Sequence, residues 1–268
     1  MPFALVALAS YLLATALLVR SLAAGSEGPR GWIAPAGIAL LFHAGFHVAA
    51  WHEAAGLDLH FFAALSLVGL GMATLTTIVG ANGRLAALGG VVFPLAAASL
   101  LGYLLYGHVR AEGLDWRLQL HAWCALLAYA TLAIAALLAI MLWIQERALR
   151  QRQVQGWRRA LPPLRELETL LFRTIAVGFA LLTATLLTGA LFVQDLLEQH
   201  LAQKTVLSVL SWLAFGGLLL GRWRFGWRGQ TAVRWTLSAM ALLLLAFFGS
   251  KFVLELVLHR AMVPTATP

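Results

Sequence analysis

Apolar residues recur along the chain in long blocks that are separated by short polar segments. About eight of these blocks approach the roughly 20 residues that a helix needs to cross the hydrocarbon core of a bilayer. They cover residues 3–19, 32–51, 61–80, 85–107, 119–144, 171–193, 205–221 and 231–258. The pattern predicts an all-α fold, a polytopic bundle of transmembrane helices, because a helix satisfies its own backbone hydrogen bonds in lipid.

The composition agrees with a single integral membrane domain over residues 1–268. Hydrophobic residues make up 61% and charged residues only 11% of the chain, whereas soluble domains carry roughly 25% charged residues. The mean hydropathy is +0.84. Cys124 is the single cysteine, which excludes an internal disulfide, and without a C-x-x-C-H motif the chain is not itself a c-type cytochrome.

The net charge of +8 is concentrated in a few short segments. Six arginines fall within 145–170, and Arg222, Arg224, Arg228 and Arg234 follow the seventh block. The positive-inside rule predicts that these segments are cytoplasmic, so both termini are predicted to be periplasmic. The same placement argues against nucleic acid as a partner and leaves membrane lipid as the expected contact.

Histidines are the most informative residues of so apolar a sequence, because imidazole is a common metal ligand and binds haem iron. His43 and His47 lie four residues apart in the second block, so they share a helix face. His47 lies about 6 Å below Trp51, at roughly 1.5 Å per residue. His121 enters the membrane from the same side in the fifth block. The hypothesis is a haem iron held axially by His43 and His121, with His47 as a further cofactor contact.

The alternative is that each of these histidines only hydrogen-bonds a neighbouring helix. In that case the chain is a transporter, or a scaffold for a neighbouring ion transporter, and holds no haem. Polar groups at membrane depth nevertheless mark functional sites by default. The sequence has no hydrolytic or phosphate-binding pattern, so we expect a protein that is not an enzyme.

Other polar residues give weaker signals. Five histidines fall in predicted outer segments, where a histidine usually has no specific role: His52, His60, His108, His200 and His259. Of these, His108 and His200 are the candidate pair for an external haem site. Lys251 and Glu255 lie four residues apart and can pair on one helix face. Small residues that favour close helix contact are grouped in the sixth block: Thr183, Thr185, Thr188, Gly178 and Gly189.

Two stretches of the chain resemble a known family. The first is the run Leu161-Pro162-Pro163-Leu164-Arg165-Glu166-Leu167-Glu168, which continues into Phe172-Arg173 and Leu182-Thr183 to Thr188-Gly189. The second begins at Gly226-Trp227-Arg228-Gly229 and closes with Phe247-Phe248-Gly249-Ser250-Lys251. Together with the segments around His43 and Leu120-His121, these runs are similar to the YpjD branch of the cytochrome c assembly (CcsA/HemX-like) membrane proteins.

This resemblance implies an eight-helix protein of the bacterial inner membrane that handles haem during cytochrome c maturation. It also implies a non-covalent, b-type haem and cytochrome c maturation components as partners. Members of the wider family hold haem through histidines, and His43 and His121 stand where such ligands are expected. The external signature Trp-Gly-x-x-Trp-x-Trp-Asp of the synthase members is missing, and only Asp115-Trp116 resembles it, in reversed order. We therefore expect haem handling without synthase activity.

Overall fold

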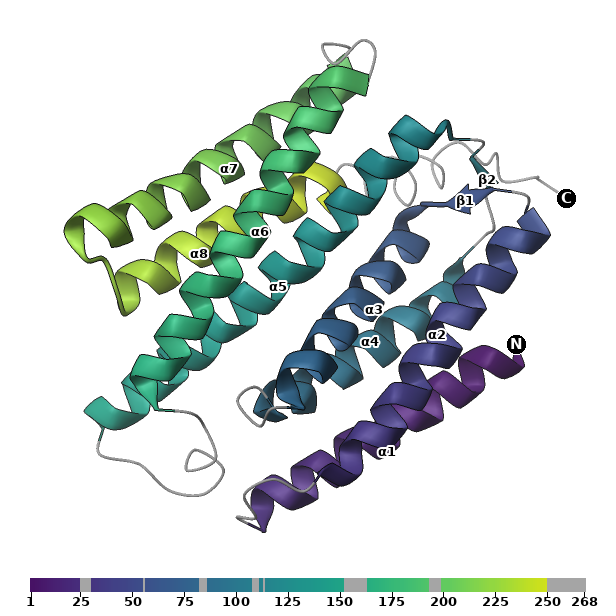
Figure 1. Ribbon diagram of the computed structural model, residues 1–268, viewed down its shortest axis with the longest axis horizontal. Coiled ribbons are helices and arrows are strands. Elements are labelled where there is room, and N and C mark those ends of the chain that lie inside the picture. The colour runs from purple at the N-terminus through teal and green to yellow at the C-terminus, as the bar shows by residue number, and fades with distance from the viewer. Residues whose placement is uncertain are drawn as a thin grey trace, which may run out of the picture.

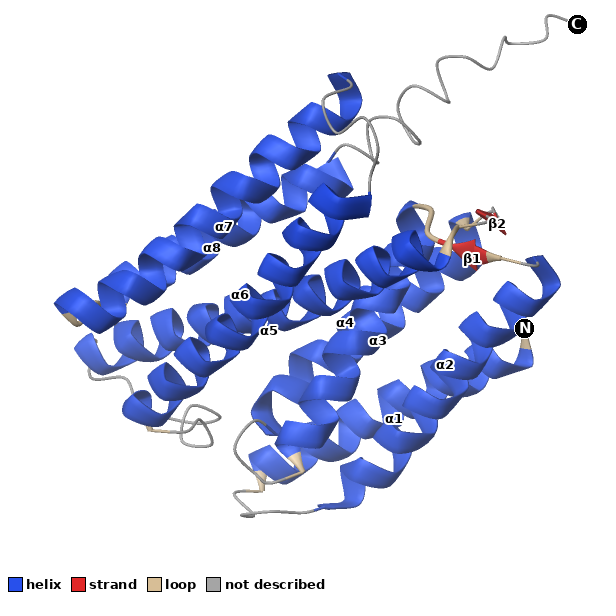
Figure 2. Cartoon of the chain, turned by 45° about the horizontal axis from the view of Figure 1, so that its top comes forward, coloured by secondary structure: helices blue, strands red, loops and turns tan. Residues whose placement is uncertain are grey.

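The computed structural model describes residues 1–24, 30–54, 56–81, 86–107, 111–112, 114–151, 163–192 and 199–249. Within these ranges nearly all regular structure is helical (Figure 1 and Figure 2). The long helices are α1 (Pro2–Ala23), α2 (Ile33–Ala54), α3 (Phe61–Gly80), α4 (Ala86–Tyr106), α5 (Trp116–Arg150), α6 (Leu164–Phe192), α7 (Gln199–Phe225) and α8 (Gln230–Leu244). In the described part of the chain, eight helical segments are long and apolar enough to cross a membrane, which confirms the predicted all-α bundle.

The central helices extend beyond the predicted apolar blocks. α5 spans Trp116–Arg150, whereas its apolar block covers 119–144, and α6 already begins at Leu164. An apolar block marks only the part of a helix that lies in hydrocarbon, and the helix continues into the polar interface. α6 starts directly after Pro163, as expected for a residue that is poorly tolerated inside a helix. Pro162 lies outside the described residues.

The last membrane segment changes its helical type. α8 passes into a short π-helix, η3 (Leu245–Gly249), and the rest of the predicted block to 258 lies outside the described residues. At this junction the hydroxyl of Tyr129 on α5 donates a hydrogen bond to the carbonyl oxygen of Leu243, over 2.5 Å. This bond ties the end of α8 to the central helix of the bundle.

The helices form two groups of four that lie side by side (Figure 1). α1, α2, α3 and α4 pack together, as do α5, α6, α7 and α8, and α3 packs against α5 to join the groups. α5 and α3 have larger buried fractions than the other membrane helices. Because most of these helices are apolar on all sides, the sequence pattern does not show which face of a helix packs and which faces lipid.

One end of the bundle carries a pair of two-residue strands. β1 (Leu57–Asp58) follows α2 and pairs antiparallel with β2 (Ala111–Glu112), which precedes α5. Asp58 is opposite Ala111 in this pair. The pairing joins two loops that are predicted to be periplasmic, and it fixes the backbone just before α3.

The opposite end is organised around the turn between α7 and α8. Gly226 and Gly229 have φ values of +67° and +59°, a backbone region that favours glycine. The backbone N–H of Gly229 donates to Oε1 of the buried Glu168 on α6, over 2.9 Å. The guanidinium of Arg222 lies 4.7 Å from the centre of the Phe172 ring. The arginine-rich segments therefore converge on one end of the molecule.

Candidate functional site

A buried chain of polar side chains connects α1, α2 and α3. The hydroxyl of Tyr11 lies 3.1 Å from Nδ1 of His43, and Nε2 of His43 lies 2.9 Å from the hydroxyl oxygen of Ser66. Nε2 of His47 lies 3.0 Å from the same oxygen. All four side chains are at most 1% exposed. His43 and His47 therefore share one face of α2, as their spacing predicted, and Ser66 joins them.

Matching donors with acceptors shows which hydrogen-bond arrangement these four side chains prefer. In the described structure, the Tyr11 hydroxyl has only His43 Nδ1 as an acceptor. If Tyr11 donates to His43, then His43 Nε2–H donates to Ser66, Ser66 donates to His47 Nε2, and only the Nδ1–H of His47 stays without a partner. Each alternative arrangement leaves two buried polar groups without a partner, and each such group destabilises the fold by about 1–3 kcal/mol. His47 therefore presents an N–H at Nδ1.

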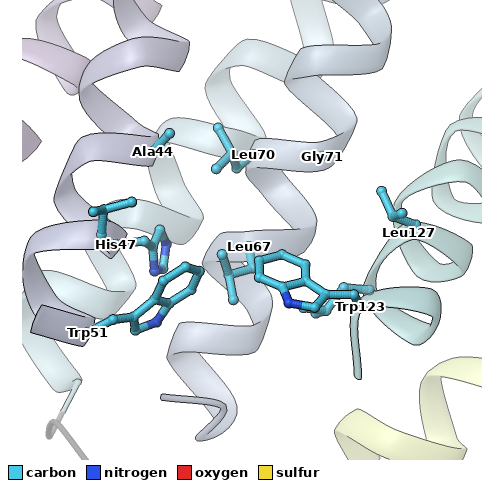
Figure 3. Close-up of a pocket in the computed structure, with 10 residues that line it drawn as sticks. Ala44, His47, Trp51, Leu67, Leu70, Gly71, Trp123 and Leu127 are labelled. Atoms are coloured by element: carbon cyan, nitrogen blue, oxygen red, sulfur yellow. The ribbon is translucent and has the colours of Figure 1, made fainter. Parts of the chain in front are cut away.

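A cavity of about 230 Å³ lies beside His47. Figure 3 shows His47 and Trp51 of α2 on one side, Leu67 of α3 at the back and Trp123 of α5 on the other side. The lining residues are Ala44, His47, Val48, Trp51, Leu67, Leu70, Gly71, Trp123, Leu126 and Leu127. The rings of Trp51 and Trp123 meet edge to face, with centroids 5.6 Å apart. The cavity is thus an almost wholly apolar space.

A second polar cluster lies at the strand end of the bundle. Nδ1–H of His60 donates to Oδ1 of Asp58 over 2.6 Å, and the hydroxyl of Tyr103 donates to Oδ2 of Asp58 over 2.9 Å. Both Asp58 and His60 are buried. The Tyr103 ring stacks on His47, with centroids 5.3 Å apart, so the two clusters are in contact. No specific role was predicted for His60, and the sequence signal that could have indicated one is Asp58, two residues earlier.

The pKa of Asp58 lies below its ordinary value. Burial by itself raises the pKa of this carboxyl, and the hydrogen bonds that it accepts from His60 and Tyr103 lower the pKa by more. The carboxylate form is therefore the one that the folded protein stabilises.

His121 forms its hydrogen bonds with α6, away from the network of Tyr11, His43, Ser66 and His47. Its Nδ1–H donates to the carbonyl oxygen of Thr185 over 3.1 Å, and the Thr188 hydroxyl lies 3.2 Å from the same nitrogen. Because a carbonyl oxygen can only accept, the hydrogen of the neutral ring is at Nδ1 and the lone pair is at Nε2. A ring nitrogen held by a carbonyl in this way is typical of histidines that bind metals.

The structure brings His43 and His47 together but leaves His121 on another helix interface. The interhelical hydrogen bonds that the haem-free alternative predicts are present for all three histidines. They engage both ring nitrogens of His43, whereas they leave Nε2 of His121 open. No group of three or more His, Cys, Asp or Glu side chains among the described residues is arranged to hold a metal ion.

Some of the other predicted residues cannot be placed. His108, His259, Lys251 and Glu255 lie outside the described residues, and so does the side chain of His200. His52 is exposed near the end of α2. The external pair His108 and His200 stays a prediction.

The small residues of α6 make the expected close contacts. A Cβ atom on Gly178 would lie 2.5 Å from Leu132 of α5, and one on Gly189 would lie 3.1 Å from Cε1 of His121. Thr183 accepts a hydrogen bond from the indole nitrogen of Trp212 on α7, over 2.9 Å. α6 therefore packs closely against both neighbouring helices.

The sequence of the chain is similar to those of known proteins. The family model described as "Cytochrome C assembly protein" matches residues 33–258. The chain is 33% identical over 264 residues to "Inner membrane protein YpjD" of Escherichia coli (strain K12), which covers 95% of this chain and 98% of that protein. It is 29% identical over 156 residues, half of each chain, to "Cytochrome c biogenesis protein CcsA" of Prochlorococcus marinus (strain MIT 9515). No solved structure matches the chain.

These matches agree with the membrane architecture. The family model covers seven of the eight membrane helices, from α2 to α8, and the relative named YpjD is matched over nearly its whole length. The eight apolar helices and this relative together identify a multi-pass protein of the inner membrane. The chain belongs to the cytochrome c assembly protein family.

Proposed function

We propose that this chain binds haem in the inner membrane and handles it during the assembly of c-type cytochromes. The observation that carries the proposal is the hydrogen bond from Nδ1 of His121 to the carbonyl oxygen of Thr185. This bond orients the ring and leaves the Nε2 lone pair free, which is what an axial haem ligand requires. Family membership supports the assembly role over a transporter or scaffold.

The three predicted histidines fit a haem iron to different degrees. His121 can bind iron at Nε2 without losing a hydrogen bond. His43 can bind iron only after it loses its hydrogen bond to Tyr11 or Ser66. His47 carries a hydrogen on Nδ1 in the preferred hydrogen-bond arrangement, so that nitrogen has no lone pair for iron. A bound haem would supply an iron that takes histidine nitrogen as a ligand. We propose His121 as the primary ligand and His43 as a second ligand that requires rearrangement.

The proposed orientation has both termini in the periplasm. The arginines at the ends of α5, α6 and α7 converge on the end of the bundle that holds the turn from Gly226 to Gly229. Positive charge of this kind favours the cytoplasmic side. The short strands and the cluster of Asp58 with His60 then lie on the periplasmic side, and the cytochrome c maturation components are the proposed partners.

The test is an absorption spectrum of the protein purified in detergent after expression with added haem. We expect a Soret band that is lost in His121→Ala. His52→Ala is the matched control because His52 is exposed near the end of α2, and it is expected to keep the band. His43→Ala then separates the ligand models: loss of the band would support two axial histidines, and retention would leave His121 as the sole ligand from this pair.

The absence of a Soret band in the wild-type protein, with haem supplied, would reject haem binding. A band that survives in His121→Ala would reject the assignment of His121. Tagging the N-terminus and testing its access to a periplasmic protease checks the orientation separately.

A further inference from the structure

Arg117 and His121 lie on the same face of α5, one helical turn apart. His121 contacts α6 through Thr185 and Thr188. The guanidinium of Arg117 lies 5.9 Å from the centre of the Phe192 ring, which is also on α6 and follows Thr188 by four residues. A line of contacts therefore runs along the interface of α5 and α6, from His121 to Arg117 and toward the end of the bundle that carries the short strands.

The guanidinium of Arg117 is held by aromatic rings and has no acidic partner among the described residues. Its carbon atom lies 5.6 Å from the centre of the Trp116 ring and 5.9 Å from that of Phe192, and the two ring centres are 6.2 Å apart. A guanidinium is attracted to aromatic faces at such distances. Arg117 is exposed and forms no ion pair with a residue that the structure describes. Its N–H donors are therefore available to an acceptor from outside the chain.

The charged neighbours of Arg117 along these helices leave it in this state. Asp115 precedes Arg117 by two residues, and its side chain accepts a hydrogen bond from the backbone N–H of Trp116 at the start of α5, over 2.8 Å. The other arginines of α5 and α6 lie toward the opposite end of the two helices: Arg147, Arg150, Arg165 and Arg173. Arg117 is thus the arginine of this helix pair that lies near His121.

The open nitrogen of His121 can be reached from outside the bundle. His121 is only partly buried, and among the described residues its Nε2 is not one of the enclosed polar atoms that lack a partner. Leu120 next to it on α5 and Leu191 on α6, three residues after Thr188, are exposed apolar side chains. A flat apolar group can therefore approach this nitrogen along an apolar surface.

Arg117 and His121 lie at different depths in the membrane. The apolar block of α5 begins at residue 119, so Arg117 lies in the interface, and His121 lies about 6 Å deeper at roughly 1.5 Å per residue. Haem has a matching division, because its propionates are carboxylates at one edge of an otherwise apolar ring. Charged groups favour the hydrated interface, whereas an apolar ring favours the hydrocarbon.

We propose that Arg117 binds the propionates of a haem whose iron is ligated by His121. This inference rests on the proposed function and adds a carboxylate-binding residue to the same site. A guanidinium forms charge-assisted hydrogen bonds with carboxylates, and its planar shape matches theirs. Trp116 and Phe192 hold the guanidinium in place before haem arrives, which lowers the entropic cost of binding. Arg117 thereby favours a porphyrin with free carboxylates and orients its charged edge toward the interface.

The experiment titrates the full chain in detergent with haem and, separately, with haem dimethyl ester, whose propionates are esterified and uncharged. The Soret band gives a dissociation constant for each probe. Arg117→Gln is the principal variant because it removes the charge and keeps a polar side chain, and Arg117→Lys keeps the charge. Arg147→Gln is the matched control, since Arg147 is also exposed on α5 and its guanidinium lies 5.7 Å from the centre of the Trp143 ring.

We expect the wild type to bind haem roughly fivefold more tightly than the ester, as for one charge-assisted contact at a partly exposed site. Arg117→Gln should lose this preference, because haem binding weakens and ester binding stays unchanged. Arg117→Lys should keep part of the preference, and Arg147→Gln should keep all of it. Added salt should reduce the preference of the wild type, since salt screens exposed charges. Thermal unfolding of each variant shows whether it is folded.

Three results would overturn the role of Arg117 and leave haem binding intact. They are equal affinities of the wild type for the two probes, an unchanged preference in Arg117→Gln, and an equal loss of affinity for both probes in that variant. The last result would show that Arg117 only supports the local structure. The absence of a Soret band with either probe in the wild type would instead reject haem binding itself and the role of Arg117 with it.

Discussion

The hydroxyl oxygen of Ser66 on α3 lies 3.0 Å from Nε2 of His47 on α2. The same oxygen is 2.9 Å from Nε2 of His43, whose other nitrogen contacts Tyr11 on α1. A single hydroxyl therefore connects two imidazoles in the interior of the bundle. The packing of α1, α2 and α3 brings these side chains together, and their hydrogen bonds in turn determine which nitrogen of His47 carries the hydrogen.

Ser66→Ala is expected to destabilise the protein by about 1–2 kcal/mol, because two buried imidazole nitrogens lose their partner. The measurement is unfolding in detergent, followed by circular dichroism. Ser99→Ala is the control, since the Ser99 hydroxyl is also buried but bonds to Ala96 within its own helix. Equal losses in the two variants would contradict a structural role for the Ser66 bridge.

Acidic pH should weaken the hydrogen-bonded cluster of Asp58, His60 and Tyr103. The pKa of Asp58 is lowered in the folded protein, since the hydrogen bonds from His60 and Tyr103 outweigh the effect of burial, which raises it. Its contribution to stability is therefore fully present above the ordinary value of 3.8 and is lost as the pH falls through the lower folded pKa.

Asp58→Asn tests this dependence in unfolding experiments between neutral and acidic pH. The variant should be less stable at neutral pH and lose part of the acid dependence of the wild type. Asp115→Asn, which changes the residue that caps α5 and leaves Asp58 intact, should keep the Asp58 contribution. An unchanged acid profile in Asp58→Asn would speak against the role of this carboxylate.

Gly189→Ala should weaken haem binding roughly fivefold, the equivalent of about one hydrogen bond. The new Cβ atom would lie 3.1 Å from Cε1 of His121, so the ring must shift away from the Thr185 carbonyl. Haem titration followed at the Soret band measures the effect. Gly37→Ala is the control because its Cβ atom would meet nothing within 4 Å. If both variants bind haem like the wild type, the orientation of His121 is not important for binding.

Gly229→Ala should destabilise the turn between α7 and α8 more than Gly226→Ala. Both positions have a positive φ, which is unfavourable for alanine by roughly 1–2 kcal/mol. A Cβ atom on Gly229 would also lie 2.6 Å from Oε1 of Glu146, whereas one on Gly226 would meet nothing within 4 Å. Unfolding measurements on the two variants separate the strain from the contact, and equal losses would show that Glu146 moves aside.

The membrane fold followed from the sequence because a bilayer allows few solutions. A block of about 20 apolar residues must satisfy its backbone internally, and a helix does so from local bonds alone. The blocks at 32–51 and 61–80 accordingly match α2 and α3 closely. α5 is longer than its block because its ends carry polar residues, which hydropathy does not assign to a membrane helix.

The candidate site was only partly predictable. The spacing of His43 and His47 was enough to put them on one face of α2, since helical periodicity is a local property. The partner of each histidine depends on how the helices pack, and the sequence pattern does not encode packing in an all-apolar helix. Ser66 and Tyr11 were not recognised for this reason, and His121 was expected near His43 although it contacts α6.

The sequence by itself determined that the chain crosses the membrane about eight times, where its helices lie and which end is rich in arginine. Each of these properties depends on local composition and length. The tertiary structure decided that both ring nitrogens of His43 have partners, that His121 keeps Nε2 open, and that Ser66 joins His43 to His47. These relationships join residues on different helices, so they exist only once the bundle is packed.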